Sequence, residues 1–522
     1  MNKGEIALVL HAHLPYVRSE KPGSLEEDWF FQALMECYLP LLQTLEEAAS
    51  SSEQQPKVTI GLSPTLLSLL QDQDLKNRFP EWLKVRIDLL NEVPKSQKNA
   101  AIHLQSRIKN QLEQWDSCNG DLIKRFSALQ VSEVVDLLTC AATHGYLPLL
   151  REHPRSINGQ LKTAVKEHHR LFGVHPLGIW LPECAYYEGL DNLLIDSGLR
   201  YAVLDGHGLL HATPRPRYGI YAPICSQNGV AFFGRDSEAT LPVWSARAGY
   251  PGNPDYREFH KDFGWELPIE RLQEIGLKEP RPLGLKLHKV TSQNTALEEK
   301  EIYEPEVASI RVKENAKDYL QGRRAQLNNL DIQMGGKPLL VAPFDAELFG
   351  HWWFEGPSFL AELFRQAKKE EISFTRLRDV LTDSPQLQIC EPCPSSWGKG
   401  GYHDYWLNES NAWIVPEWSK ASATMIELCS TKKHGETETK LLTQAARQLL
   451  LSQSSDWSFI LRAGTTTKLA KDRINLHLSR FWALISAVQG AEKVTTEQIS
   501  NLEKQDQIFP LIDIQDWAQS DF

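Results

Sequence analysis

The chain has 522 residues, of which 42% are hydrophobic and 24% charged, a composition typical of globular proteins and enough for roughly two to four domains. Its formal net charge of −11 argues against nucleic acid or an anionic membrane as the main partner, because both attract basic patches; a neutral ligand is compatible with this charge. The first apolar run, residues 6–10, is too short for a signal peptide, and no run approaches the ~18 apolar residues of a membrane span. With eight sparse cysteines and a single CxxC pair, at Cys390 and Cys393, we expect a cytoplasmic protein with reduced thiols.

Short apolar runs alternate with amphipathic segments along most of the chain. Helical patterns occupy several of the intervals, for example 28–48 and 187–198. Unbroken apolar strands that alternate with helices indicate a parallel sheet covered on both faces, and about seven such units favour a barrel over an open sheet. In chain order, the runs predicted to be strands are 6–13, 58–64, 134–145, 178–183, 201–208, 283–290 and 338–347.

Three segments depart from this alternation. Residues 80–130 are helical and charged, and we predict that they form an insertion. Residues 209–280 are rich in Pro, Gly and Tyr and are predicted to form a small loop-rich subdomain. Long amphipathic helices without intervening strands follow the last run, so we predict an α/β barrel over 1–385 and an α-helical C-terminal domain over 386–522.

Polar side chains end at least five of the apolar runs. Because the carboxyl ends of parallel strands meet at one edge, we expect these side chains to cluster. Two chemistries use such a set: histidines and an Asp can bind zinc for hydrolysis, and two carboxylates can act as acid and nucleophile on a glycosidic bond. The residues in question are His11, His13, His144, Glu183, Asp205, His207, Asp345 and Glu347.

Tryptophan is the residue type that favours the second chemistry. The chain has 15 tryptophans, and seven of them fall between residues 352 and 457. Flat apolar rings stack on the faces of sugars, whereas a metal hydrolase has no special need for them. A non-catalytic glucan-binding protein would keep the tryptophans but would need no pair of acids.

Several motifs together resemble glycoside hydrolase family 57, and within it the 1,4-α-glucan branching enzymes. The similarity is carried by LHAHLPY (10–16), THGY (143–146), WLPECAYYEGL (180–190) and APFDAELFGHWWFEGP (342–357). It extends through YPGNPDYREFHKDFGW (250–265), SSWGKGGYHDYWLNES (395–410) and LSQSSDWSFILRAGTT (451–466), and so covers essentially the whole chain.

The resemblance implies a (β/α)7 barrel with an inserted small domain and an α-helical C-terminal domain. It also implies retaining chemistry on an α-glucan without a cofactor or a metal. The Glu of the family's WxPE-type motif matches Glu183, which would be the nucleophile, and the Asp of its FD motif matches Asp345, which would be the acid/base. Glu347 is a rival for the acid role.

Other residues are assigned to substrate binding by the same resemblance. Structural roles are the alternative for each of them; Asp456, for example, also fits the N-cap of a helix. The predicted substrate-binding residues are His11, His13, His144, Arg257, Trp265, Trp397, Trp406 and Asp456.

One stretch departs from the family's pattern. Branching members carry a loop over the site with a tyrosine near its tip, but the corresponding residues here, 234–249, contain no tyrosine. We therefore expect a branching enzyme with substantial hydrolysis. An α-amylase or a 4-α-glucanotransferase of the same family is the alternative, and a zinc-dependent barrel hydrolase is less favoured. We expect a monomer whose partner is an α-glucan, not nucleic acid or a membrane.

Overall fold

The structure, a computed structural model, describes residues 4–51, 56–245, 247–384, 386–431, 433–491 and 494–518. Within these residues, seven parallel strands follow one another in the order β8-β1-β2-β3-β4-β5-β7, and two short strands, β6 and β9, extend the sheet beyond β7. The bounds are β1 (Glu5–Ala12), β2 (Val58–Leu62), β3 (Val135–Cys140), β4 (Gly178–Trp180), β5 (Tyr201–Leu204), β6 (Ile224–Cys225), β7 (Ala231–Gly234), β8 (Leu339–Asp345) and β9 (Gln388–Ile389).

The sheet curls so that its two sides meet. A backbone hydrogen bond of 2.9 Å from Asp236 N to Val341 O joins the segment after β7 to β8. Every residue of β2 and β3 is buried, which explains why these parallel strands are largely apolar. Pro343 is accommodated within β8 because that strand pairs with β1 and lies at the end of the strand order. The predicted seven-stranded α/β barrel is confirmed.

The sixth parallel strand is not the one that the sequence predicted. Residues 283–290 form no strand; the backbone N–H groups of Leu283, Gly284 and Leu285 instead donate to the carboxylate of Asp262. The strand beside β5 is β7, within the stretch predicted as a loop-rich subdomain. The prediction was wrong because β7 lies within a stretch rich in Pro, Gly and Tyr, which indicated loops, whereas backbone N–H groups of the apolar run 283–290 donate to the Asp262 carboxylate.

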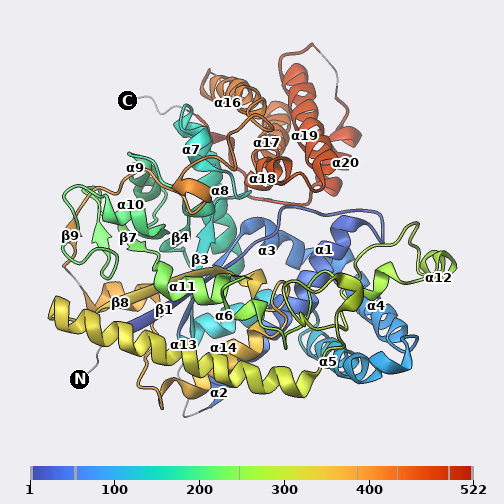
Figure 1. The fold of residues 1–522 in the computed structure, drawn as a ribbon. Coiled ribbons are helices and arrows are strands. Elements are labelled where there is room, and N and C mark those ends of the chain that lie inside the picture. Colours follow the sequence, from blue (N-terminus) through green and yellow to red (C-terminus); the bar gives the residue numbers. More distant parts are fainter. Residues whose placement is uncertain are drawn as a thin grey trace.

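Helices surround the sheet and extend beyond it (Figure 1). The charged segment 80–130 is helical, as predicted, and contains α5, α6 and most of α4. The helices before residue 386 are α1 (Leu25–Ala33), α2 (Leu39–Ser50), α3 (Pro64–Gln71), α4 (Gln73–Leu89), α5 (Lys98–Ser117), α6 (Leu122–Val131), α7 (Leu147–Leu150), α8 (Pro154–Phe172), α9 (Leu190–Asp196), α10 (Gly206–Leu210), α11 (Ser237–Trp244), α12 (Ile269–Glu274), α13 (Pro305–Met334), α14 (Gly356–Ala367) and α15 (Leu377–Asp383), with a π-helical turn, Leu34–Tyr38, between α1 and α2.

The C-terminal helices pack together at one end of the molecule (Figure 1). They are α16 (Ile414–Thr431), α17 (Glu436–Ser452), α18 (Ser455–Ala463), α19 (Thr467–Val488) and α20 (Thr496–Gln505). Residue 385, beside the predicted domain boundary, lies outside the described residues, and β9 still pairs with β6 beyond it. The domain boundary therefore stays a prediction. None of the described helices is both long enough and apolar enough to cross a membrane.

The turn between α17 and α18 contacts the barrel directly. Ser455 N donates to His144 O over 3.1 Å, and Ser454 forms an antiparallel bridge with Gly145. Because His144 follows β3, this turn lies against the carboxyl ends of the strands, where the predicted site residues are.

Candidate active site

Glu183 follows β4 in a single 3-10 turn, Pro182–Cys184. Its φ of +62° lies in the left-handed region, which a non-glycine residue occupies only when surrounding contacts stabilise it. Trp397 supplies two such contacts: its backbone N–H donates to Glu183 O over 3.0 Å, and its indole Nε1 donates to Glu183 Oε2 over 2.8 Å. The carboxylate is thus held in one orientation.

The protonation of Glu183 is governed by its surroundings. Burial raises its pKa to about 7; the hydrogen bond from Trp397 lowers it, and the charges of Asp345 and Asp456 raise it. The side chain nevertheless keeps some contact with solvent, with 16% of it exposed. It is therefore a carboxylate that ionises near neutral pH and can be reached from outside.

Asp345 is the last residue of β8 and pairs in register with His11. Burial raises the pKa of Asp345 well above its usual range; the charge of Glu347 adds to this effect and Arg235 opposes it. No side-chain hydrogen bond ties Asp345 to another of the described residues. A protonated carboxyl without an internal partner is suited to give its proton to a ligand.

Three histidine rings stack beside the two acids. The ring centroids of His13 and His144 are 4.0 Å apart and those of His11 and His144 are 5.0 Å apart, and His11 also stacks on Trp180. The Nε2 atoms of His11 and His144 share a hydrogen bond of 3.0 Å. Burial, with repulsion from neighbouring histidines, lowers the pKa of both His11 and His144 well below the usual value. These two rings are therefore neutral hydrogen-bonding groups.

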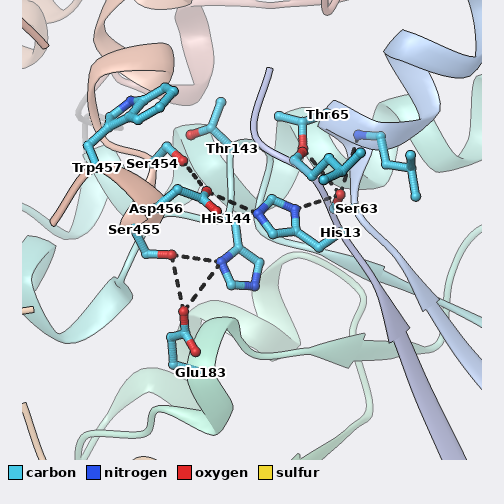
Figure 2. Close-up of polar contacts among 12 residues, drawn as sticks. His13, Ser63, Thr65, Thr143, His144, Glu183, Ser454, Ser455, Asp456 and Trp457 are labelled. Atoms are coloured by element: carbon cyan, nitrogen blue, oxygen red, sulfur yellow. Dashed lines mark hydrogen bonds and ion pairs between the residues drawn. The ribbon is translucent and has the colours of Figure 1, made fainter. Parts of the chain in front are cut away.

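Asp456 reaches this cluster from α18 (Figure 2). Its Oδ2 lies 3.0 Å from His13 Nε2, and His13 Nδ1 lies 2.8 Å from Ser63 Oγ, so the His13 ring is held at both nitrogens. Burial would raise the pKa of Asp456, but His13, His144 and Ser454 together hold it at about 2. Asp456 is not the N-cap of α18, because that position is Ser454.

Ser455 was missed by the sequence reasoning. Its hydroxyl lies 2.7 Å from His144 Nδ1 and donates to Glu183 Oε1 over 3.4 Å, so it joins the histidine stack to the carboxylate (Figure 2). The only signal in the sequence was its position next to Asp456. A serine in a polar segment is too common to stand out.

Glu347, the rival acid, is engaged elsewhere. Its Oε1 accepts hydrogen bonds from His13 N (3.0 Å) and from the Tyr38 hydroxyl (2.5 Å). Burial raises its pKa to about 7, against the effect of these donors. The side chain thus anchors the end of β1, which makes it less suited than Asp345 to reach a ligand.

Two groups of side chains could hold a metal ion. They are His11, Cys140 and His144, and His13, His144 and Asp456; within each, the ligand atoms lie within 4.8 Å of one another. The contact between His13 and Asp456 joins two of these atoms directly, at 3.0 Å.

Comparison with known protein families identifies the family of this chain. Residues 7–391 match the sequence profile of glycosyl hydrolase family 57, and residues 417–517 match that of the 1,4-alpha-glucan branching enzyme C-terminal domain. The chain belongs to glycosyl hydrolase family 57.

Individual members of family 57 are similar over nearly the whole chain. The 1,4-alpha-glucan branching enzyme TK1436 of Thermococcus kodakarensis is 31% identical over 96% of this chain and 76% of its own length. The crystal structure of the GH57-type branching enzyme from Pyrococcus horikoshii has a TM-score of 0.89, with 30% identity over 99% of this chain and 97% of that one. The alpha-amylase AmyC from Thermotoga maritima has a TM-score of 0.91, with 34% identity over 99% of this chain and 100% of that one.

Three predicted substrate contacts of this family 57 chain lie outside the cluster. Trp406 is 2% exposed and stacks on Tyr146 at 4.5 Å, and Arg257 is 6% exposed and pairs with Glu36 at 2.7 Å. Both are buried against other side chains, and their contact with substrate stays a prediction. Trp265 is 53% exposed on a separate 3-10 turn, Phe263–Trp265, and its contact with substrate stays a prediction.

Tryptophans lie both in the paired motif that follows β8 and in the stretch 234–249, which lacks a tyrosine. Trp352 is 44% exposed and Trp353 is 2% exposed, so only the first of the pair is available to a ligand. Residues 234–249, apart from residue 246, which lies outside the described residues, contain α11, and Trp244 ends that helix. Its ring lies 5.9 Å from that of Trp397 and 6.4 Å from that of Trp352. Trp244 therefore adds an aromatic side chain next to the partner of Glu183.

Proposed function

We propose that this chain is a retaining 1,4-α-glucan branching enzyme. The observation that carries the proposal is the match of residues 417–517 to the branching-enzyme C-terminal domain, because a turn of the same helical region contributes Ser455 and Asp456 to the cluster around Glu183. The similar branching enzymes from Thermococcus kodakarensis and Pyrococcus horikoshii support the same assignment.

In the proposed reaction, Glu183 attacks the sugar carbon while Asp345 protonates the leaving glycosidic oxygen. The raised pKa of Asp345 supports its role as the acid, and the hydrogen bond from Trp397 favours the ionised form of Glu183. Asp345, now a carboxylate, then takes the proton from the 6-hydroxyl of an acceptor glucan. That oxygen attacks the glucosyl-enzyme, which releases Glu183 and forms an α-1,6 branch.

The remaining polar residues position these two groups. Asp456 and Ser63 hold the His13 ring, and Ser455 connects His144 to Glu183. Histidine ring nitrogens beside a carboxylate pair are suited to hydrogen bonds with sugar hydroxyls. We assign His11, His13 and His144 to the subsite around the cleaved bond, with Trp397 as its aromatic wall.

Hydrolysis competes with transfer, because water reaches the same glucosyl-enzyme. A well-oriented acceptor gains an effective molarity of roughly 10⁵ M or more. It reacts in preference to water when the site also excludes water. The stretch 234–249 lacks a tyrosine but places Trp244 beside Trp397. We therefore propose branching accompanied by substantial hydrolysis.

The alternative is an α-amylase of the same family, which the similarity to AmyC favours. Proton NMR of amylose treated with the protein, read together with a reducing-end assay, separates the possibilities. New α-1,6 signals support branching. Reducing ends without α-1,6 signals would make the chain an amylase, and changed α-1,4 chain lengths without either would make it a 4-α-glucanotransferase.

A further inference from the structure

Two polar residues at the end of β5 have no part in the proposed chemistry. Asp205 directly follows β5, and His207 lies in the first turn of α10. Among the described residues, neither side chain makes a hydrogen bond to Glu183 or Asp345. They contact each other instead, since His207 Nδ1 lies 3.0 Å from Asp205 Oδ1.

The other nitrogen of His207 reaches the loop that carries Trp397. His207 Nε2 lies 3.0 Å from Gly401 O, a contact between residues 194 positions apart in the chain. Both partners of the ring, the carboxylate and the carbonyl, are acceptors, so a ring with hydrogens on both nitrogens makes the two hydrogen bonds together. Gly401 has a φ of +81°, and a Cβ atom at this position would lie 2.8 Å from His207 Nε2. The close approach of ring and loop therefore requires glycine.

Asp205 also holds a second side chain against Trp397. Its Oδ2 accepts a hydrogen bond from Arg235 Nη1 over 3.4 Å, and the guanidinium carbon of Arg235 lies over the Trp397 ring, 5.7 Å from the centroid. Arg235 directly follows β7, and its backbone N–H donates to Leu204 O in β5 over 2.9 Å. One carboxylate is thus tied to the Trp397 loop through His207 and to the Trp397 ring through Arg235.

The position of Gly401 determines that of Trp397 because the loop is closed by short backbone hydrogen bonds. Ser396 N donates to Gly401 O over 2.8 Å, and Gly401 N donates to Gly398 O over 2.8 Å. Ser396 and Gly398 are the two neighbours of Trp397 in the chain, so a shift of Gly401 moves both sides of the tryptophan. The Trp397 indole in turn donates to Glu183 Oε2 over 2.8 Å.

We infer that Asp205 and His207 are positioning residues for Glu183. By holding Gly401 in place, they keep the Trp397 indole N–H on the carboxylate. The role of Glu183 as nucleophile rests on the proposed function, whereas the linkage from β5 to its carboxylate does not. Without the linkage, the indole hydrogen bond should be weakened while the side chains themselves are all retained.

The full chain labelled with ¹⁵N at tryptophan tests the linkage without any turnover. The Trp397 indole resonance is assigned by its absence from Trp397→Phe, and its change with pH reports the ionisation of Glu183. The same titration of Glu183→Gln shows how much of the change comes from other groups.

Two conservative variants of His207 separate its two contacts. The amide of His207→Asn can donate to Asp205 but is too short to reach Gly401, whereas that of His207→Gln can reach Gly401. We expect His207→Asn to raise the midpoint of the titration by roughly 0.5 pH unit or more, because a weakened donor stabilises the carboxylate less, and His207→Gln to stay close to the wild type. An unaltered midpoint in His207→Asn would overturn the inference.

Kinetics with amylose show whether the effect passes through the indole. The acidic limb of kcat/KM against pH should move with the midpoint in His207→Asn. In the Trp397→Phe background, the same substitution should add no further shift, because the indole hydrogen bond is already absent. An equal shift in that background would mean that His207 acts on Glu183 directly and would refute the linkage. A wild type without turnover would refute the proposed function but leave the result from the indole resonance standing.

A matched control and a variant in the loop complete the test. His211 is an exposed histidine at the end of the same helix, so His211→Asn should leave both the midpoint and the acidic limb unchanged. Gly401→Ala approaches the contact from the loop side, since its methyl group meets His207, and should raise the midpoint as His207→Asn does. Thermal unfolding shows that each variant is folded. A folded Gly401→Ala with the wild-type midpoint would contradict the inference.

Discussion

Trp397 contacts Glu183 twice: its indole N–H donates to Oε2 over 2.8 Å and its backbone N–H donates to the Glu183 carbonyl over 3.0 Å. One residue from beyond the last barrel strand therefore fixes both the side chain and the left-handed backbone of the proposed nucleophile. A substitution of the Trp397 side chain removes the indole hydrogen bond but keeps the backbone one, so the two contacts can be separated.

Glu183→Gln should abolish turnover and leave glucan binding intact, because the amide keeps the shape of the side chain but cannot attack carbon. We expect a loss on the order of 10³-fold or more in kcat. Initial rates on amylose and retention on a glucan gel measure the two properties. The control is Glu188→Gln, an exposed carboxylate in the same segment, which should retain full activity. Near-normal rates in Glu183→Gln would refute its role as nucleophile.

Trp397→Phe should shift the acidic limb of the pH–rate profile to higher pH. The indole hydrogen bond lowers the pKa of Glu183, which is about 7 with the bond in place, so the pKa should rise when the bond is removed. The profile of kcat/KM against pH reports this value. Trp406→Phe is the control, since the Trp406 indole stacks on Tyr146 and makes no hydrogen bond to Glu183. A lower rate with an unshifted limb would show that Trp397 only packs.

The Glu183 carboxyl should reduce the stability of the folded protein at pH values above its pKa. Burial raises the pKa of Glu183 from 4.5 to about 7, so the folded protein binds this proton more tightly than the unfolded chain does. The contribution to stability is fully present below pH 4.5 and is lost as the pH rises through 7, by roughly 3 kcal/mol. Thermal unfolding of the wild type and Glu183→Gln should coincide near pH 4 and diverge at pH 8, with the variant more stable. Parallel curves across this range would be inconsistent with the raised pKa.

Dialysis against a strong chelator should leave activity unchanged. We expect this result because His13 Nε2 and Asp456 Oδ2 are paired with each other at 3.0 Å, as are the Nε2 atoms of His11 and His144. Rates before and after dialysis, with elemental analysis of the same samples, test the expectation. If activity disappears and returns with added zinc, the zinc-hydrolase alternative is correct.

Trp244→Ala should raise hydrolysis relative to transfer, because it removes the ring that lies 5.9 Å from Trp397 and 6.4 Å from Trp352 and opens that side to water. We expect the ratio of reducing ends to α-1,6 linkages to increase several-fold. Trp244→Phe keeps an aromatic ring and should lie close to the wild type. If both variants keep the wild-type ratio, another part of the stretch 234–249 controls access of water.

Much of the proposed site followed from the sequence alone, for a physical reason. Parallel strands bury both faces, so they are continuous apolar runs, and their carboxyl ends converge on one edge. The polar residues that end these runs, among them His11, His144 and Asp345, could therefore be grouped before any coordinates were known. The same motifs indicated the family.

Tertiary structure decided the rest. Asp456 is 443 residues from His13 in the chain yet bonds to it, and Ser455 reaches Glu183 across 272 residues; no local pattern encodes such contacts. β7 lies in a stretch rich in Pro, Gly and Tyr, so pairing with β5 rather than the local sequence identifies it as a strand. Trp406 and Arg257 have residue types suited to sugar binding, but both are buried, because whether a side chain meets solvent depends on what packs over it and not on its own chemistry.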